Sequence, residues 1–224
     1  MSEQLPLELG HRPALGRDDF LVSDSNREAV RWIDVWPDWP APGLVIAGPQ
    51  ASGKSHLAQV WCARSGAVAV DHAALAEAGA PARLAEHRNL VIDDADQLRD
   101  ERALLHLYNL VAEAGGSLLL TAAEPPARWA VALADLRSRL SALPVVEIRA
   151  PDDGLIQAVL VKLFADRQLR VDPELVAYLA ARLDRSLVIA TNAVDLLDRA
   201  ALSARRALTI PFARETLRAA GLLQ

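Results

Sequence analysis

Residues 48–55 read GPQASGKS and match the spacing G-x-x-x-x-G-K-S/T. In this pattern, the P-loop, glycines let backbone N–H groups close around phosphate oxygens, and the following helix presents its positive end to them. We expect Lys54 to reach the β and γ phosphates and the Ser55 hydroxyl to ligate Mg²⁺. The motif predicts a site for ADP or ATP with Mg²⁺, formed by Gly48, Pro49, Gln50, Ala51, Ser52, Gly53, Lys54 and Ser55.

A second candidate feature is the acidic end of the apolar run in NLVIDDAD, residues 89–96. Asp93 is placed to hold Mg²⁺ through water, as a Walker B aspartate does, and Asp94 is placed to orient an attacking water. A solvated acidic turn is the alternative interpretation of these two residues. The P-loop upstream favours the metal-binding interpretation.

These residues need a sheet to position them, and five short apolar runs predict its strands. They are LVIAG (44–48), AVAVD (67–71), NLVID (89–93), SLLLT (117–121) and PVVEI (144–148). Near-continuous hydrophobicity is typical of strands that are buried on both faces of a parallel sheet. Helical patterns lie between the runs, as in residues 101–115, where Leu104, Leu107, Tyr108 and Val111 share one face. The alternation predicts an α/β fold with a parallel five-stranded sheet.

The strand signals stop near residue 150, and four helical patterns follow. They are LIQAVLVKLFADRQL, PELVAYLAARL, AVDLLDRAALSAR and PFARETLRAAG. The second and the fourth open on proline, which is tolerated in the first turn of a helix. We therefore expect a nucleotide-binding domain over residues 11–150 and a small all-helical lid domain over residues 151–224.

The composition restricts the class of partner. The chain has 24 Lys+Arg against 29 Asp+Glu, a formal net charge of -5. No overall positive field draws it to phosphate backbones, so we expect no direct sequence-specific DNA binding. Its start has neither a basic region nor a long apolar run, which argues against a signal peptide and a membrane span. The single cysteine, Cys62, fits a reducing cytoplasm.

Five segments, in order along nearly the whole chain, resemble the Hda-type, DnaA-related AAA+ proteins that regulate bacterial replication initiation. They are GPQASGKSHLAQVW, LVIDDAD, LADLRSRL, ARLDR and LTIPFARETL. The resemblance implies an AAA+ P-loop NTPase domain followed by a helical lid. The segment FLVSDSN also resembles the part of DnaA-type modules that packs on adenine, which implies a base pocket of Phe20, Leu21, Val22 and Asn26.

The resemblance implies a role for DLRSRL, residues 135–140. Arg139 is similar to the arginine finger that AAA+ proteins extend to the nucleotide of a neighbouring subunit, a group worth about 10³ to 10⁵ in rate. The described activity of this family is to stimulate hydrolysis of ATP held by the initiator DnaA. Arg139 is therefore implied to be catalytic in trans. The chain's own P-loop is implied to hold a nucleotide, often ADP, that shapes the interaction surface.

Two positions depart from the family's pattern. Val188 stands where the lid usually carries a sensor arginine, and Ala123 replaces an acidic residue after the fourth strand, although Thr121 is kept as a nucleotide-site residue. Arg185, in the preceding turn, is the candidate substitute for the sensor. Both losses remove groups that sense or activate a γ-phosphate, so we predict nucleotide binding with weak or absent intrinsic ATP hydrolysis. Whether the isolated chain is an enzyme stays open.

The first ten residues contain QLPLEL, which resembles the peptide that tethers this family to the DNA polymerase III β sliding clamp. In an extended segment alternate side chains point to one side, so Leu5, Leu7 and Leu9 share an apolar face. Pro6 lowers the entropy cost of ordering, and Gln4 both donates and accepts hydrogen bonds. A stray apolar patch is the alternative. The resemblance implies a clamp-binding peptide over residues 1–10 and a cytoplasmic, replisome-associated protein; homodimerisation stays open.

Three other functions stay open as alternatives: a DnaA-like AAA+ ATPase, a helicase loader and a small P-loop metabolite kinase. DnaA carries a basic DNA-binding domain after its AAA+ module, whereas this chain has no basic cluster. Capture of a clamp or of a helicase discriminates between the regulator and the loader. Phosphoryl transfer to a small molecule would identify the kinase.

Overall fold

The computed structural model describes residues 20–77, 80–84 and 86–223, so the predicted clamp peptide lies outside the described residues. The strands are β1 (Gly43–Ala47), β2 (Val68–Val70), β3 (Asn89–Ile92), β4 (Ser117–Ala122) and β5 (Val145–Glu147). The helices among them are α1 (Arg27–Asp34), α2 (Lys54–Ser65), α3 (His72–Leu75), α4 (Ala80–Leu84), α5 (Glu101–Glu113) and α6 (Ala134–Ser141), with 3-10 turns η2 (Ala95–Gln97) and η3 (Pro126–Arg128). The chain continues into α7 (Asp153–Asp166), α8 (Pro173–Ala180), α9 (Leu187–Ala204) and α10 (Ile210–Ala219).

The strands form one parallel sheet in the order β2-β3-β4-β1-β5, which confirms the predicted α/β class. Parallel strands all end at the same edge of a sheet, and ligands bind outside those ends. β4 lies between β1 and β3, and its Thr121 is in register with Ile46 of β1. This strand order therefore places three features at the same edge of the sheet. They are the P-loop, which follows β1, the acidic turn, which follows β3, and Thr121 of β4.

Neighbouring residues of each central strand pack on opposite faces of the sheet. Leu44 and Ile46 belong to the buried cluster that includes α1 and α2, whereas Val45 belongs to the cluster that includes α5 and α6. In β4, Leu119 packs with the first cluster, and its neighbours pack with the second. Because both faces are covered, the strands have the near-continuous apolar sequence from which they were predicted.

Three tryptophans pack the segment that follows α1 against α2, which is the helix that follows the P-loop. The Trp39 ring stacks on Trp61 with centroids 5.4 Å apart, and the Trp36 ring meets Trp61 edge-on at 5.9 Å. Trp61 is fully buried. Aromatic pairs of these geometries contribute about 0.5–1.5 kcal/mol each beyond their buried area. The cluster therefore stabilises the helix on which the nucleotide site depends.

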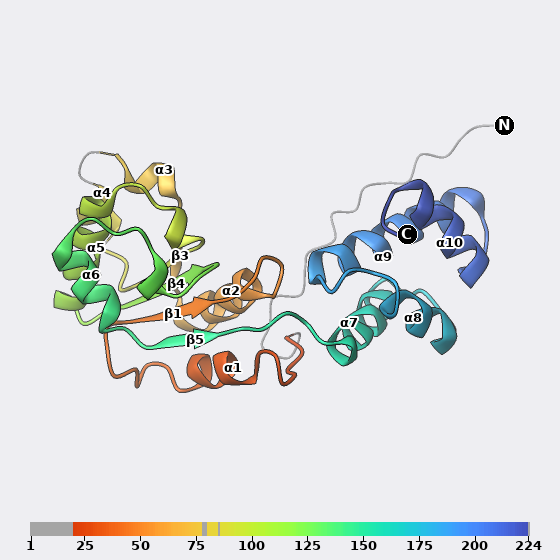
Figure 1. Cartoon of the computed structure of the whole chain (residues 1–224), viewed down its shortest axis with the longest axis horizontal. Helices are drawn as coiled ribbons and strands as arrows, with labels where there is room; N and C mark the ends of the chain where they lie inside the picture. Colours follow the sequence, from red (N-terminus) through yellow and green to blue (C-terminus); the bar gives the residue numbers. More distant parts are fainter. Residues whose placement is uncertain (1–19, 78–79, 85, 224) are drawn as a thin grey trace.

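The helices α7 to α10 gather at one end of the molecule and share their own buried cluster, with Phe164 of α7 among its largest members (Figure 1). Side-chain caps define the starts of α7 and α9: Asp152 accepts from the Leu155 N–H at 2.7 Å, and Ser186 accepts from the Ile189 N–H at 3.3 Å. Ser186 starts α9 at Leu187, well before the pattern that predicted this helix. The sequence pattern did not predict the start of α9, because its apolar residues LVIA are equally compatible with a strand.

None of the helices in the described ranges is long and apolar enough to cross a membrane.

Candidate nucleotide-binding site

The P-loop joins β1 to α2 through a turn that requires glycine. A Cβ on Gly48 would lie 2.2 Å from the Ile148 carbonyl oxygen, so no other residue fits without displacing the backbone of the neighbouring chain segment. Gly53 has a φ of 102° and is the N-cap residue of α2, with no side-chain cap. The N–H groups of the first turn of α2 are therefore open to an anionic ligand, which is the arrangement that binds phosphate.

Lys54 and Ser52 point into this loop. The Lys54 side chain is 6% exposed, and its Nζ donates to the carbonyl oxygens of Gly48 and Pro49 at 2.8 and 2.9 Å. An ammonium has three donors, so one is left over. The Ser52 hydroxyl is buried without a hydrogen-bond partner among the described residues, a state that costs about 1–3 kcal/mol. Phosphate oxygens would satisfy both groups, so the loop fits a nucleotide.

The predicted Mg²⁺ ligands lie together at the end of β3. Asp93 Oδ2 accepts a hydrogen bond from Ser55 Oγ at 2.7 Å, and Asp93 Oδ1 accepts from Thr121 Oγ1. Carboxylate and hydroxyl oxygens are ligands that Mg²⁺ prefers. The described part of the chain contains no group of three His, Cys, Asp or Glu side chains able to hold a metal ion. A Mg²⁺ held by Ser55 and Asp93 would therefore take its other ligands from phosphates and water, as this ion usually does.

Asp94 takes a different direction from Asp93. Its backbone is left-handed, with a φ of 49°, and its N–H donates to Thr121 Oγ1 at 3.0 Å. The side chain is exposed and faces the cleft beside the P-loop. Thr121 therefore bonds to both aspartates, which fixes one carboxylate at Ser55 and leaves the other facing the cleft.

A cleft of about 710 Å³ separates the P-loop from the start of α9, within the size range of small-molecule sites. The Leu187 N–H donates to the Ala51 carbonyl oxygen at 3.4 Å, and the two elements thus meet at one side of the cleft. The lining residues are Gln50, Ala51, Gly53, Lys54, Ser55, His56 and Asp94 from the P-loop domain, and Ser186, Leu187, Val188, Thr191 and Asn192 from the lid.

Several of these cleft residues were not predicted. Thr191 and Asn192 follow Val188 by three and four positions, so they share its side of α9. That helical spacing was the signal from which they could have been found. His56 follows the P-loop motif directly, and the motif makes no demand on that position. No sequence signal pointed to it.

The two departures from the family's pattern leave the cleft short of positive charge. Val188 lines the cleft, is 55% exposed and brings no charge. Arg185 is not one of the lining residues, because its guanidinium pairs with both carboxylate oxygens of Asp153 at 2.9 and 3.1 Å. Ala123 is exposed, and its N–H donates to Asp96 Oδ2 at 3.1 Å. Among the described lining residues, Lys54 is the one lysine or arginine.

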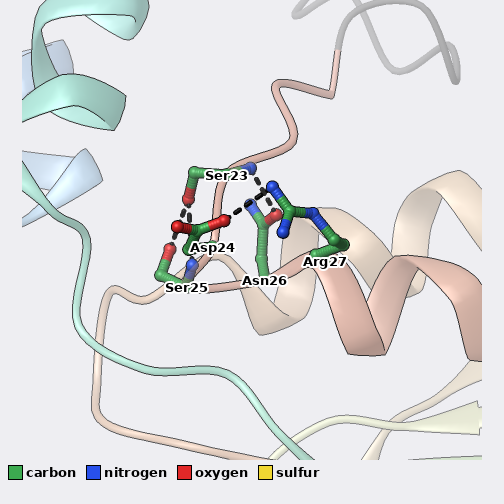
Figure 2. A network of polar contacts seen from close by, with 5 residues as sticks. All are labelled: Ser23, Asp24, Ser25, Asn26 and Arg27. Carbon is green, nitrogen blue, oxygen red and sulfur yellow. Dashed lines mark hydrogen bonds and ion pairs between the residues drawn. The ribbon is translucent and has the colours of Figure 1, made fainter.

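Asn26 shapes the segment that was predicted to contact adenine. Its Nδ2 donates to the Leu21 carbonyl oxygen, and its Oδ1 accepts from the Ser23 N–H, both at 2.9 Å. Figure 2 shows the Asn26 amide reaching back toward Ser23, with the Ser23 and Ser25 hydroxyls hydrogen-bonded beside it at 2.7 Å. Because both ends of the buried amide bond to this same segment, Asn26 fixes the backbone from which the neighbouring apolar side chains project.

The predicted base-pocket residues Phe20, Leu21 and Val22 differ in exposure. Phe20 is buried and meets the ring of His56 edge-on, with centroids 5.3 Å apart. Leu21 is half-buried, and Val22 is 46% exposed. His56 also lines the cleft from the P-loop side, so it links this segment to the cleft.

Arg139 lies apart from the cleft. It is on α6, which Figure 1 shows beside α5 at the end of the molecule opposite the lid. The side chain is exposed, does not line the cleft, and makes no hydrogen bond or ion pair with any described residue. The chain therefore presents its P-loop and this arginine on separate surfaces.

Comparison with known sequences identifies the lid. Residues 153–217 match the family model described as "Hda, lid domain". The chain is also 28% identical to an uncharacterised protein of Haemophilus influenzae over 235 aligned residues, which cover 97% of this chain and 99% of that protein.

Comparison with solved structures identifies the fold. Domain III of the replication initiation protein DnaA from Thermotoga maritima has a TM-score of 0.82 at 16% identity, with 95% of this chain and 98% of that chain covered. A single-substitution variant of RuvB from Thermotoga maritima has a TM-score of 0.73 at 14% identity, with coverages of 90% and 70%. DnaA bound to AMPPCP and single-stranded DNA has a TM-score of 0.71 at 16% identity, with coverages of 87% and 69%. The chain therefore has the fold of DnaA domain III, and its helical lid matches the Hda lid family, so it is similar to Hda-type, DnaA-related AAA+ proteins.

Proposed function

We propose that this protein is a negative regulator of DNA replication initiation. Bound to the DNA polymerase III β sliding clamp, it stimulates hydrolysis of the ATP held by DnaA. Arg139 acts in trans on that ATP, and the chain's own P-loop holds ADP or ATP with Mg²⁺.

The observation that carries this proposal is the state of Arg139. Two other arginines are used within the chain: Arg137 bonds to the Val131 carbonyl oxygen, and Arg185 pairs with Asp153. The Arg139 guanidinium is exposed and bonds to none of the residues that the structure describes. No described residue occupies its donors, and a planar guanidinium matches phosphate oxygens in two parallel hydrogen bonds.

The chain's own cleft supports nucleotide retention with little hydrolysis. The open start of α2, Lys54 and the buried Ser52 hydroxyl provide phosphate contacts. Val188 stands in place of a charge, so none of the described lid residues that line the cleft offers a cation to a γ-phosphate in the transition state. Mg²⁺, when bound, would neutralise phosphate charge. Structures of DnaA with AMPPCP show that the related fold accommodates a nucleotide.

Hydrolysis of ATP bound to DnaA in the presence of DNA-loaded clamp tests the role of Arg139. Arg139→Ala is expected to reduce the stimulated rate at least about 10³-fold, because the charge on the transition-state phosphate is lost. Arg139→Lys should recover little of it, since an ammonium lacks the planar fork. Arg128→Ala is the matched control, because Arg128 is exposed and pairs with Glu124 at the surface. Unchanged stimulation by Arg139→Ala would overturn the proposal.

Removal of residues 1–10 tests the clamp peptide, which rests on the sequence pattern of Gln4, Leu5, Leu7 and Leu9. The shortened chain is expected to lose clamp binding in a pull-down while its affinity for ADP stays within about twofold, since the P-loop is intact. Retained clamp binding would contradict the assignment.

A further inference from the structure

The start of α6, the helix that carries Arg139, is held by a side chain from α5. Glu101 accepts hydrogen bonds from the N–H groups of Ala132 and Leu133 at 2.8 and 2.7 Å. Leu133 is the N-cap residue of α6 and offers no side-chain cap. Helix starts leave N–H groups that need acceptors from outside the helix. The Glu101 carboxylate supplies such an acceptor from a neighbouring element.

Arg137 holds the same loop through its carbonyl groups. Its Nε and Nη2 donate to the Val131 carbonyl oxygen at 3.2 and 2.6 Å. In residues 131–133, two N–H groups therefore donate hydrogen bonds to Glu101 of α5, and the Val131 carbonyl oxygen accepts from Arg137 of α6. The backbone hydrogen bonds of Ala132 and Leu133 and, to a smaller extent, the charge of Arg137 lower the pKa of Glu101, so the carboxylate that makes these contacts stays ionised.

The packing of α6 then decides where Arg139 points. Leu136 and Leu140 are buried against α5 and the sheet, which fixes the inner face of the helix. Arg137 and Arg139 are two residues apart, so their directions differ by about 200° around the helix axis. Arg137 returns to the loop while Arg139 points outward. Since α6 has 8 residues, a shift at its start is carried through to Arg139.

We propose that Glu101 is a positioning residue for Arg139. Its carboxylate fixes the start of α6 and thereby the place from which the guanidinium reaches the phosphate of the partner's ATP. The inference rests on the proposed function of Arg139 in trans. A misplacement of about 1 Å in a catalytic group costs on the order of 10²-fold in rate, so a loop anchor remote from the nucleotide is able to control the reaction.

The test compares Glu101→Ala and Glu101→Gln in the full chain, with DnaA, bound ATP and DNA-loaded clamp. Glu101→Ala should lower the maximal stimulated rate by about tenfold or more, whereas Glu101→Gln should lower it less, because its amide oxygen still accepts a hydrogen bond. The concentration for half-maximal stimulation and the affinity for ADP should stay within about twofold of wild type. Glu113→Gln, at the exposed end of the same helix, is the matched control and should behave as wild type.

A wild-type maximal rate in folded Glu101→Ala protein would overturn the inference. A weaker half-maximal concentration at an unchanged maximal rate would also overturn it, since Glu101 would then act on docking. If Glu101→Ala does not fold, the maximal rate of Glu101→Gln decides, and a wild-type rate rejects the role.

The double variant Glu101→Ala with Arg139→Ala separates this inference from the proposed function. It should be no slower than Arg139→Ala alone, because a positioning residue has no effect once the group that it positions is absent. An additional loss would mean that Glu101 acts by another route. An active Arg139→Ala variant rejects the proposed function, whereas an inactive one combined with fully active Glu101 variants rejects the positioning role alone.

Discussion

Lys54 is the residue on which we expect the phosphate end of the candidate nucleotide site to depend most. Its ammonium is buried, bonds to two P-loop carbonyl oxygens and keeps one donor for a phosphate. Ser52 adds a buried hydroxyl that lacks a partner in the described chain. A loop whose donors are left unused in this way is preorganised to bind an anion.

Replacement of Lys54 should therefore weaken nucleotide binding. We expect Lys54→Ala to reduce the affinity for a fluorescent ADP analogue by about 10- to 100-fold, since a charge-assisted hydrogen bond is worth about 1.5–3 kcal/mol. Lys162→Ala is the matched control, because that lysine pairs with Asp166 on the lid. An affinity that falls equally in both variants would exclude a specific role for Lys54.

At the level of helices and loops, the contact between α5 and α6 makes stability depend on pH. The pKa of Glu101 is lowered in the folded protein, chiefly by the backbone hydrogen bonds from Ala132 and Leu133. A carboxylate with a lowered folded pKa contributes stability above its unfolded pKa, near 4.5, and this contribution disappears as the pH falls through the folded value.

The thermal midpoint of Glu101→Gln should accordingly lie below that of wild type at pH 7, and the difference should shrink as the pH falls below about 4.5. Melting curves of both proteins between neutral and acid pH measure this. A difference that is independent of pH would show that the lost contact owes nothing to the charge of Glu101.

Across the molecule, the shape of the candidate nucleotide cleft depends on how the lid meets the P-loop. Leu187, at the start of α9, bonds to Ala51, and Val188 faces the space beside Lys54 and Asp94. The lid side of the cleft is neutral in every described lining residue. A cleft of this kind has little means of distinguishing a triphosphate from a diphosphate.

Restoring a cation at Val188 should change that preference. Val188→Arg is expected to raise the affinity for ATP relative to ADP by about tenfold, because a guanidinium there adds a charge-assisted hydrogen bond to the γ-phosphate. Titrations with both nucleotides in Mg²⁺ measure the ratio. Val161→Arg is the control, since Val161 is equally exposed on α7, at 56% against 55%. An unchanged ratio in Val188→Arg would mean that α9 lies out of reach of the phosphates.

Local patterns in the sequence predicted most elements correctly. The five apolar runs coincide with β1 to β5 within a few residues, and residues 104, 107, 108 and 111 form the buried face of α5 as their spacing indicated. These signals are local because strand and helix place side chains at fixed periods. The short helices α3 and α4 were missed, since four or five residues are too few to show a period.

The P-loop, the DnaA-type resemblance and the loss of charge at Val188 and Ala123 were all contained in the order of residues along the chain. Only the tertiary structure revealed the strand order and three side-chain contacts. These contacts are the hydrogen bond of Ser55 to Asp93, the ion pair of Arg185 with Asp153 and the hydrogen bond of Glu101 at the start of α6. Those contacts join residues far apart in sequence, and no local period encodes them. They form because helices pack on both faces of the sheet, and this packing brings distant segments of the chain together.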